Sequence, residues 1–149
     1  MRAVVQRVSQ GKVEVNNEVV GKINKGLLIL LGVERGDTKD DLKYIQDKVC
    51  NLRIFEDENE KMNLSLKDID GELLIVPQFT LHGDARKGRR PSFINAEDPV
   101  KAEEFYEKLI ENCSKTIRNV QSGKFGADMK VSLTNDGPVT ILLDSKKIF

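Results

Sequence analysis

Two short stretches of the sequence are apolar at nearly every position. Residues 27–33 contain only Leu, Ile, Val and one Gly, and residues 73–76 read Leu-Leu-Ile-Val. A strand that is covered on both faces has such a continuous apolar run, and β-branched residues favour a strand over a helix. We therefore predict two central strands at these positions.

Other segments alternate apolar and polar residues, as strands with one buried face do. The alternation predicts strands at residues 3–8, 12–15, 18–23, 129–134 and 139–143. Asn16 and Asn17 predict a hairpin turn. Shorter strands are expected at residues 53–55 and 120–122, whereas residues 63–67 suit either a strand or an irregular segment.

Two segments carry apolar residues at helical spacing, and each follows a capping signal. Asp37 or Thr38 suits the N-cap of the first helix, and Asp98 followed by Pro99 suits the start of the second. The buried stripes are Leu42, Ile45, Val49 and Leu52 in the first helix, and Ala102, Phe105, Leu109, Cys113 and Ile117 in the second. Because strands outnumber helices, we predict an α+β fold in one domain over residues 1–149: a mostly antiparallel, curved sheet or open barrel with two main flanking helices.

The composition is that of a globular chain. Of the 149 residues 39% are hydrophobic and 32% are charged, and the 24 basic residues balance the 24 acidic ones. No apolar run is long enough to span a bilayer, so we expect a cytoplasmic protein without a membrane partner. A nucleic-acid partner would need a local basic patch.

The residue types that hold metals and cofactors are scarce. His82 is the single histidine and is expected in a solvated loop, and no glycine-rich phosphate-binding loop is present. Cys50 and Cys113 lie in the two helical patterns, where we interpret them as buried free thiols rather than as a disulfide or a metal site. We expect no metal and no cofactor.

Polar residues follow the second central strand directly. Pro77 lacks an N–H group and ends regular pairing, and Gln78 and Thr80 place hydrogen-bonding groups beside it. A strand end with a turn explains the pattern, and so does a site built at the end of a buried strand.

The tetrapeptide Asn135-Asp136-Gly137-Pro138 interrupts the last predicted strand. It suits a simple hairpin turn. A Gly-Pro bond can also be cis at modest cost, and a cis unit would present two carbonyls in a fixed array that is able to hold an ammonium group.

Taken together, residues 77–81 and 135–140 resemble the two signature stretches of the D-aminoacyl-tRNA deacylases, Ser-Gln-Phe-Thr-Leu and Asn-X-Gly-Pro-Val-Thr. Residues 1–8, 26–33, 87–93 and 126–129 resemble the family as well. The resemblance implies an enzyme that hydrolyses the ester between a D-amino acid, or glycine, and the 3′ end of tRNA. It also implies a homodimer with its sites at the subunit interface.

The resemblance assigns roles to the two stretches. Gln78, Phe79 and Thr80 are the expected catalytic residues: their backbone N–H groups would stabilise the oxyanion, Phe79 would stack on the terminal adenine or form a pocket wall, and Thr80 would serve as a hydrogen-bonding group. Water is the expected nucleophile, helped by the 2′-hydroxyl of the terminal ribose. Substrate binding and chiral selection are expected from Gly137, Pro138, Asn135 and Met129, with the Gly-cis-Pro unit excluding L-amino acids by steric clash.

A basic loop follows the first signature. The residues expected to contact tRNA phosphates are Arg86, Lys87, Arg89 and Arg90, together with Arg7 on the first strand. A solvated charged loop is the alternative for the first four, and an ion pair within the fold is the alternative for Arg7.

Pro77 departs from the family pattern, which has Ser at this position. A related clade of deacylases also has Pro-Gln here and removes L-alanine from tRNA, so a relaxed deacylase that acts on L-Ala-tRNA is one alternative function. Another is a non-catalytic nucleic-acid-binding dimer, and a third is a hydrolase of small esters that uses Thr80 or Ser92.

Overall fold

The two continuous apolar runs form neighbouring parallel strands at the centre of the sheet. In the computed structural model, which describes residues 1–149, β3 (Gly26–Gly32) pairs with β6 (Glu72–Pro77) in register Leu28↔Leu74. The side chains of residues 73–76 are almost fully buried, because other elements cover both faces of β6. The predicted central strands are therefore confirmed.

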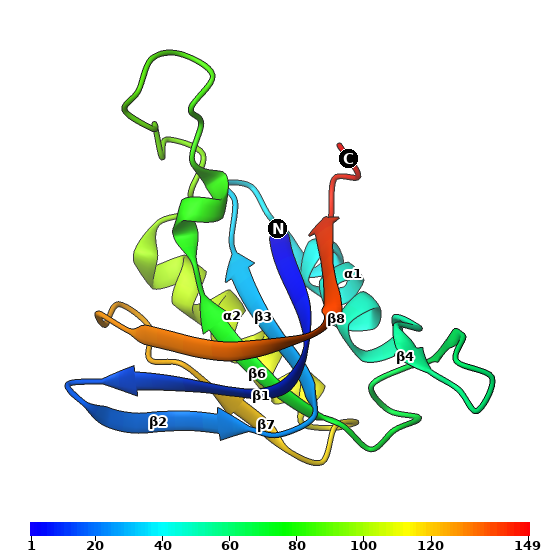
Figure 1. Ribbon diagram of the computed structural model, residues 1–149. Helices are drawn as coiled ribbons and strands as arrows, with labels where there is room; N and C mark the ends of the chain where they lie inside the picture. The colour runs from blue at the N-terminus through cyan, green and yellow to red at the C-terminus, as the bar shows by residue number, and fades with distance from the viewer.

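Strand β1 (Arg2–Val15) is long enough to join two parts of the sheet. Its first half pairs with β3, its second half pairs with β2 (Glu18–Ile23), and its other edge pairs with β8 (Lys130–Asp144). The short β7 (Val120–Ser122) pairs in parallel with β6, which completes the order β2-β1-β3-β6-β7 with β8 beside β1. Figure 1 shows β8 crossing in front of the sheet and then turning upward, so that the sheet is strongly curled.

The prediction of two strands within residues 3–15 was wrong. Gln10 and Gly11 stay paired with Thr134 and Leu133 of β8, so β1 is not interrupted. The last strand is likewise one element, which bends at residues 136–139 rather than ending there. Residues 55–56 (β4, Phe55–Glu56) and 62–64 (β5, Met62–Leu64) form a separate small hairpin.

Both predicted helices are present and begin at capping residues. Thr38 caps α1 (Lys39–Asn51) in a capping box with Asp41, and Asp98 caps α2 (Pro99–Cys113). The helices pack against one face of the sheet (Figure 1). The Tyr106 hydroxyl of α2 donates to the carbonyl oxygens of Ile75, at 2.9 Å, and of Gly123, at 3.1 Å, which ties the helix to the central strands.

The curl of the sheet creates two cores. The larger cluster, of 23 buried residues, lies between the sheet and the helices. A smaller cluster of six residues fills the concave side and consists of Val8, Val13, Ile23, Leu28, Leu74 and Val76. These features confirm the α+β fold with a curved, mostly antiparallel sheet and two flanking helices. No helix is both long and apolar enough to cross a membrane.

The amino group of Met1 forms a buried ion pair with Asp37 and a hydrogen bond with Ser145, near the end of the chain. The amino group of Met1 lies 2.7 Å from Asp37 Oδ1 and donates to Ser145 Oγ at 2.7 Å. Ser145 Oγ donates in turn to Asp41 Oδ1 at 2.6 Å, in the first turn of α1. The network fixes β1, α1 and the end of β8 to one another.

Candidate active site

The chain turns sharply where β6 ends. The N–H of Gln78 donates to the carbonyl of Leu31 at 2.7 Å, and residues 79–82 then form a short 3₁₀ helix, η1 (Phe79–His82). The first N–H groups of a helix lack partners within it. The N–H groups of Phe79 and Thr80 accordingly have no acceptor within the chain, whereas that of Gln78 is already bonded. Only two of the three expected oxyanion donors are therefore free.

A cavity of about 510 Å³ adjoins this turn. It lies between the end of β6, the first half of α2 and the segment before β8, and its walls are mostly apolar. The predicted residues Gln78, Phe79 and Met129 all line it. Thr80 does not line it; its exposed side chain accepts a short hydrogen bond from the Gln78 amide. The first signature thus forms one wall of a preformed cavity.

Two lining aromatic residues had no assigned role in the sequence interpretation. Tyr106 lies in the second predicted helix, beside its predicted buried stripe, and Phe125 lies between the strands predicted at residues 120–122 and 129–134. Tyr106 faces both the central strands and the cavity, and burial raises its pKa well above the usual value. Its position on α2, opposite the end of β6, could not be read from helical spacing alone.

Phe79 is unusually exposed for an aromatic side chain, at 58%. Its ring meets that of Phe93 edge to face, with the centroids 5.2 Å apart. The two rings leave apolar area open to solvent beside the cavity, which is typical of a surface that meets a ligand or another protein.

His82 is not the solvated loop residue that the sequence predicted. It is 2% exposed at the end of η1, and neither ring nitrogen has a hydrogen-bond partner. The ring packs against Gly32, where a Cβ atom would come within 2.9 Å of it. Burial lowers the pKa of His82, so the neutral imidazole is favoured.

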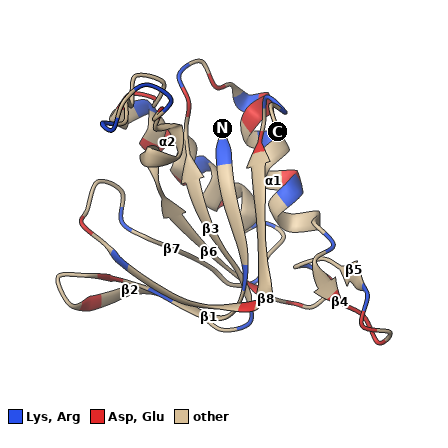
Figure 2. Cartoon of the chain, turned by 45° about the horizontal axis from the view of Figure 1, so that its top comes forward, with Lys and Arg blue, Asp and Glu red and all other residues tan.

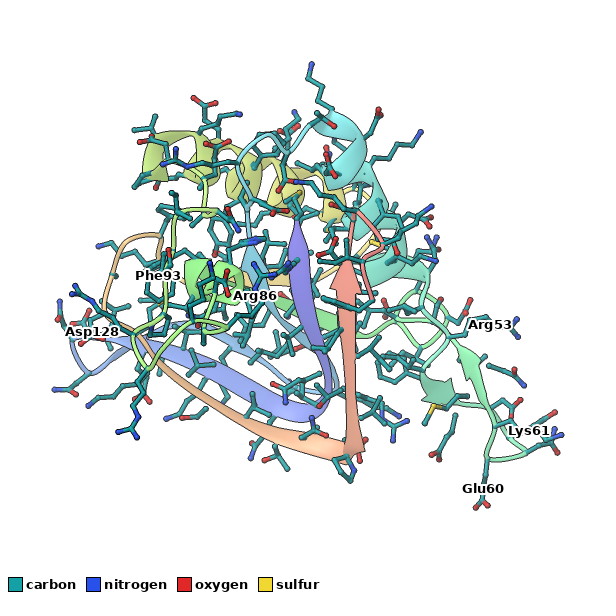
Figure 3. All side chains as sticks on the ribbon, turned by 90° about the horizontal axis from the view of Figure 1, so that it is seen from above. Arg53, Glu60, Lys61, Arg86, Phe93 and Asp128 are labelled. Carbon is teal, nitrogen blue, oxygen red and sulfur yellow. The ribbon has the colours of Figure 1, made fainter.

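The basic loop follows η1 and projects from the body (Figure 1), and Figure 2 shows its Lys and Arg residues in blue. Asp84 and Ser92 close its base with two backbone hydrogen bonds of 2.7 and 2.9 Å. Within the loop Arg86 forms a two-point ion pair with Asp84, and this hydrogen bonding lowers the pKa of Asp84 to about 2. Figure 3 shows Arg86 and Phe93 on the same side of the molecule. The other basic side chains of the loop, Lys87, Arg89 and Arg90, are exposed and form no ion pair with the chain.

The second signature lies at the bend of β8. Residues 136–139 are looped out between the pairs Val8↔Asn135 and Gln6↔Thr140, and the Gly137–Pro138 peptide bond is cis. Asn135 closes the loop: its Oδ1 accepts from Val139 N at 2.7 Å, and its Nδ2 donates to Val139 O at 3.2 Å. Gly137 and Pro138 are exposed and do not line the cavity of their own chain.

Arg7 lies beneath this bend rather than on the surface. It is 6% exposed, its Nε donates to the carbonyl of Asp136 at 2.9 Å, and its Nη1 donates to that of Ile54 at 2.8 Å. Glu56 and Asp136 carboxylates lie 3.8 and 3.9 Å from the guanidinium. Of the two interpretations of Arg7, the geometry agrees with pairing within the fold and not with a phosphate contact.

Comparisons with known proteins identify the family of the chain. The family described as D-Tyr-tRNA(Tyr) deacylase matches residues 4–144. A D-aminoacyl-tRNA deacylase of Clostridium botulinum (strain Loch Maree / Type A3) is 62% identical and one of Thermosipho africanus is 60% identical, each over the full length of both chains.

Two solved structures share the fold. One, named c-Myc DNA Unwinding Element Binding Protein, is 44% identical with a TM-score of 0.92, over 97% of this chain and 98% of the other. The second, described as a probable eukaryotic D-amino acid tRNA deacylase, is 20% identical with a TM-score of 0.82, over 95% of this chain and 97% of the other. The match along residues 4–144 and the full-length identities confirm what the signature stretches predicted: the chain belongs to the D-Tyr-tRNA(Tyr) deacylase family of hydrolases.

Proposed function

We propose that the protein hydrolyses the ester between a D-amino acid, or glycine, and the 3′ end of tRNA. The observation that carries the proposal is the pair of unbonded N–H groups of Phe79 and Thr80 at the turn where Phe79 lines a cavity of about 510 Å³. Two donors at a preformed cavity suit the oxyanion that forms when an ester carbonyl is attacked. Because the substrate is an aminoacyl-tRNA, we place the activity in the cytoplasm.

In this mechanism a water molecule attacks the ester carbonyl carbon. The carbonyl oxygen gains negative charge and accepts hydrogen bonds from the two N–H groups, and the ribose 3′-oxygen then leaves and takes up a proton. The neighbouring 2′-hydroxyl assists the proton transfer. No side chain next to Thr80 would serve as its base: Gln78 donates to its hydroxyl and is not basic. Positioning and oxyanion stabilisation suffice because the aminoacyl ester is already reactive.

Chiral selection would come from a second copy of the chain. Gly137 and Pro138 lie exposed on β8, which pairs only with β1 and so has a free edge, and Leu142 and Val131 on the same strand are exposed apolar residues. An exposed edge with apolar side chains favours association. In the proposed homodimer this backbone enters the partner's cavity and binds the α-ammonium group. A D-side chain or the hydrogen of glycine is accepted, whereas an L-side chain would collide with the backbone.

The basic loop would hold the tRNA. Lys87, Arg89 and Arg90 are exposed and unpaired a few residues beyond Phe79 and Thr80. Phosphates near the 3′ end would lie within reach of these side chains when the terminal aminoacyl group occupies the cavity.

The decisive experiment compares hydrolysis of D-Tyr-tRNA, L-Tyr-tRNA, Gly-tRNA and L-Ala-tRNA by the purified protein. The proposal expects rapid loss of the D-ester and the glycine ester, with both L-esters intact. Cleavage of L-Ala-tRNA would indicate the relaxed deacylase that Pro77 suggests. Stability of all four esters would contradict the proposed activity.

Nucleic-acid binding without ester cleavage is a second candidate function. It is favoured by the 44% identity to the structure named c-Myc DNA Unwinding Element Binding Protein. It predicts that duplex or melted DNA binds as tightly as tRNA in a mobility-shift assay, while no aminoacyl ester is lost. Preference for tRNA together with turnover would reject it.

A further inference from the structure

The two cysteines, 63 positions apart in the sequence, are neighbours in space. Cys50 lies in the last turn of α1 and Cys113 is the last residue of α2. Their Sγ atoms are 4.0 Å apart, and the side chains are buried, with 4% and 0% of their surface exposed. Both are free thiols, as the sequence predicted, but the two sulfurs are in van der Waals contact.

The surroundings make the two thiols unequal. Their mutual hydrogen bond lowers the pKa of Cys50 to about 7, against the opposing effect of burial, and the Thr116 hydroxyl, 3.7 Å from Cys50 Sγ, lowers it further. The same hydrogen bond, together with burial, raises the pKa of Cys113. Cys50 also retains 4% of its surface exposed, against 0% for Cys113. The thiolate is the nucleophilic form of cysteine, so we infer that the more exposed Cys50 meets an oxidant first.

We propose that Cys50 and Cys113 are a reversible oxidation site that closes to a disulfide between the C-terminal ends of α1 and α2. With a peroxide as oxidant, the Cys50 sulfur attacks one peroxide oxygen and becomes a sulfenic acid, and the other oxygen leaves as water. The Cys113 sulfur then attacks the Cys50 sulfur and displaces the second water. Two thiols and one hydrogen peroxide thus give one disulfide and two waters, the sulfurs being oxidised and the peroxide oxygens reduced.

The geometry allows this closure with little movement. The sulfur–sulfur distance must shorten from 4.0 Å to about 2.05 Å. Both cysteines lie at helix ends, which adjust more easily than helix centres because the last carbonyls lack intrahelical partners. The residues of α2 that line the cavity, Pro99, Ala102 and Tyr106, lie between the start and the middle of the helix, whereas Cys113 is its last residue and does not line the cavity.

The test uses the full chain, fully reduced and then treated with hydrogen peroxide or left untreated. Intact mass and thiol alkylation should show the loss of two hydrogen atoms per chain and of both reactive thiols. A non-reducing digest should yield the two cysteine-containing peptides linked together, and dithiothreitol should reverse every change. Because the disulfide closes a long loop, Tm should rise by about 10 °C on oxidation.

Cys113→Ser is the matched control, since it keeps Cys50 and differs by a single atom. The variant should show neither the linked peptides nor the rise in Tm. The proposal is overturned if peroxide leaves both thiols of the wild type alkylatable, if it links two chains instead of one, or if Cys50 gains oxygen atoms while Cys113 stays free. Because the comparison of oxidised with reduced wild type needs no variant, poor folding of Cys113→Ser would not affect it.

Discussion

Arg7 donates hydrogen bonds to backbone carbonyls of two separate segments, Ile54 before β4 and Asp136 at the bend of β8. A buried guanidinium that is bonded on two sides holds both segments at a set distance from β1. Gly137 follows directly in the chain, at φ +127, a region that favours glycine. The loop that carries the second signature is thus placed by a side chain on the first strand.

Gly137→Ala is expected to displace the backbone of the second signature and so to lower the rate of ester hydrolysis. The added Cβ would lie 2.7 Å from Arg7 Nη2 and 3.0 Å from Val139 Cγ2, and the positive φ disfavours alanine. Displacement of this backbone should reduce kcat/KM for D-Tyr-tRNA on the order of 100-fold. Gly36→Ala is the control: its φ is +84 and a Cβ there meets nothing within 4 Å. Wild-type rates and chiral selectivity in Gly137→Ala would show that this backbone has no role in the site.

His82 predicts how stability depends on pH. Its folded-state pKa lies below the usual 6.5 because the ring is buried, so the unfolded chain binds more protons in the range just below 6.5. The stabilisation from neutral His82 is therefore fully present above pH 6.5 and is lost as the pH falls towards the folded-state pKa. Between about pH 8 and pH 5, Tm should fall more steeply for the wild type than for His82→Leu. Parallel pH profiles for the two proteins would count against this account.

At the scale of elements, the basic loop and the bend of β8 differ in where they lie relative to the cavity of their own chain. The loop follows η1 directly, and the residues just before η1 and at its start, Gln78 and Phe79, line the cavity. The bend, in contrast, lies on the outer strand and away from the cavity of its own chain. In the proposed mechanism the loop would serve the site of its own chain, and the bend would serve the site of a second copy.

Removing charge from the loop should weaken tRNA binding without changing the fold. Arg89→Ala with Arg90→Ala removes two exposed cations that make no ion pair. The slope of log K against log salt concentration should become shallower by about 2, and Tm should stay within about 1 °C. Lys61→Ala with Lys67→Ala removes the same charge from another region; Figure 3 shows Lys61 at the right edge of the molecule, well away from Arg86. Equal salt slopes for the two double variants would mean that the loop does not contact phosphates.

Sequence patterns predicted the elements that depend on local signals. Thr38 and Asp98 cap the helices as expected, and the apolar run at residues 73–76 is the buried centre of the sheet. The continuity of β1 was missed because it depends on pairing with β8, more than a hundred residues away. His82 was misplaced for the same reason: its burial comes from packing on β3 and not from its own loop.

Some residues that line the cavity could be named from the sequence, but the cavity itself could not. Resemblance identified Gln78, Phe79 and Met129, which line one cavity. The cavity itself depends on α2 crossing the end of β6, which no periodicity encodes. The bonded state of the Gln78 N–H likewise follows from the position of Leu31 on the neighbouring strand.

For the whole molecule, the proposed homodimer predicts complementation between two inactive variants. Gly137→Ala would remove the backbone that one subunit offers, and Phe79→Ala would remove a cavity wall of the other. After random mixing, half of the dimers would hold one subunit of each variant. In such a dimer one of the two sites combines an intact Phe79 with an intact Gly137, and the other site has neither. Mixing should therefore restore about a quarter of wild-type activity. Native mass spectrometry of the mixture calibrates subunit exchange, because the dimer that holds both variants differs in mass from either homodimer. Mixtures that remain inactive despite exchange would place both residues in the same subunit's site.

The buried ion pair of Met1 predicts a large loss of stability on Asp37→Asn. The substitution leaves the amino group buried without its counter-charge, because both partners are fully buried. The free energy of unfolding should fall by about 3 to 5 kcal/mol, measured by urea denaturation. Asp40→Asn removes an exposed carboxylate from the same helix start and should cost less than about 1 kcal/mol. A similar loss for both variants would contradict the role of the pair.

The two hydrogen bonds between Asp84 and Ser92 have a practical consequence for engineering. Because Asp84 and Ser92 are paired, the chain enters and leaves the loop at one position, and the loop is connected to the rest of the protein only there. Segments of different length or charge could then be exchanged between these two residues as a cassette, with η1 and the cavity left in place. The same catalytic body could in this way be directed to differently structured nucleic-acid ends.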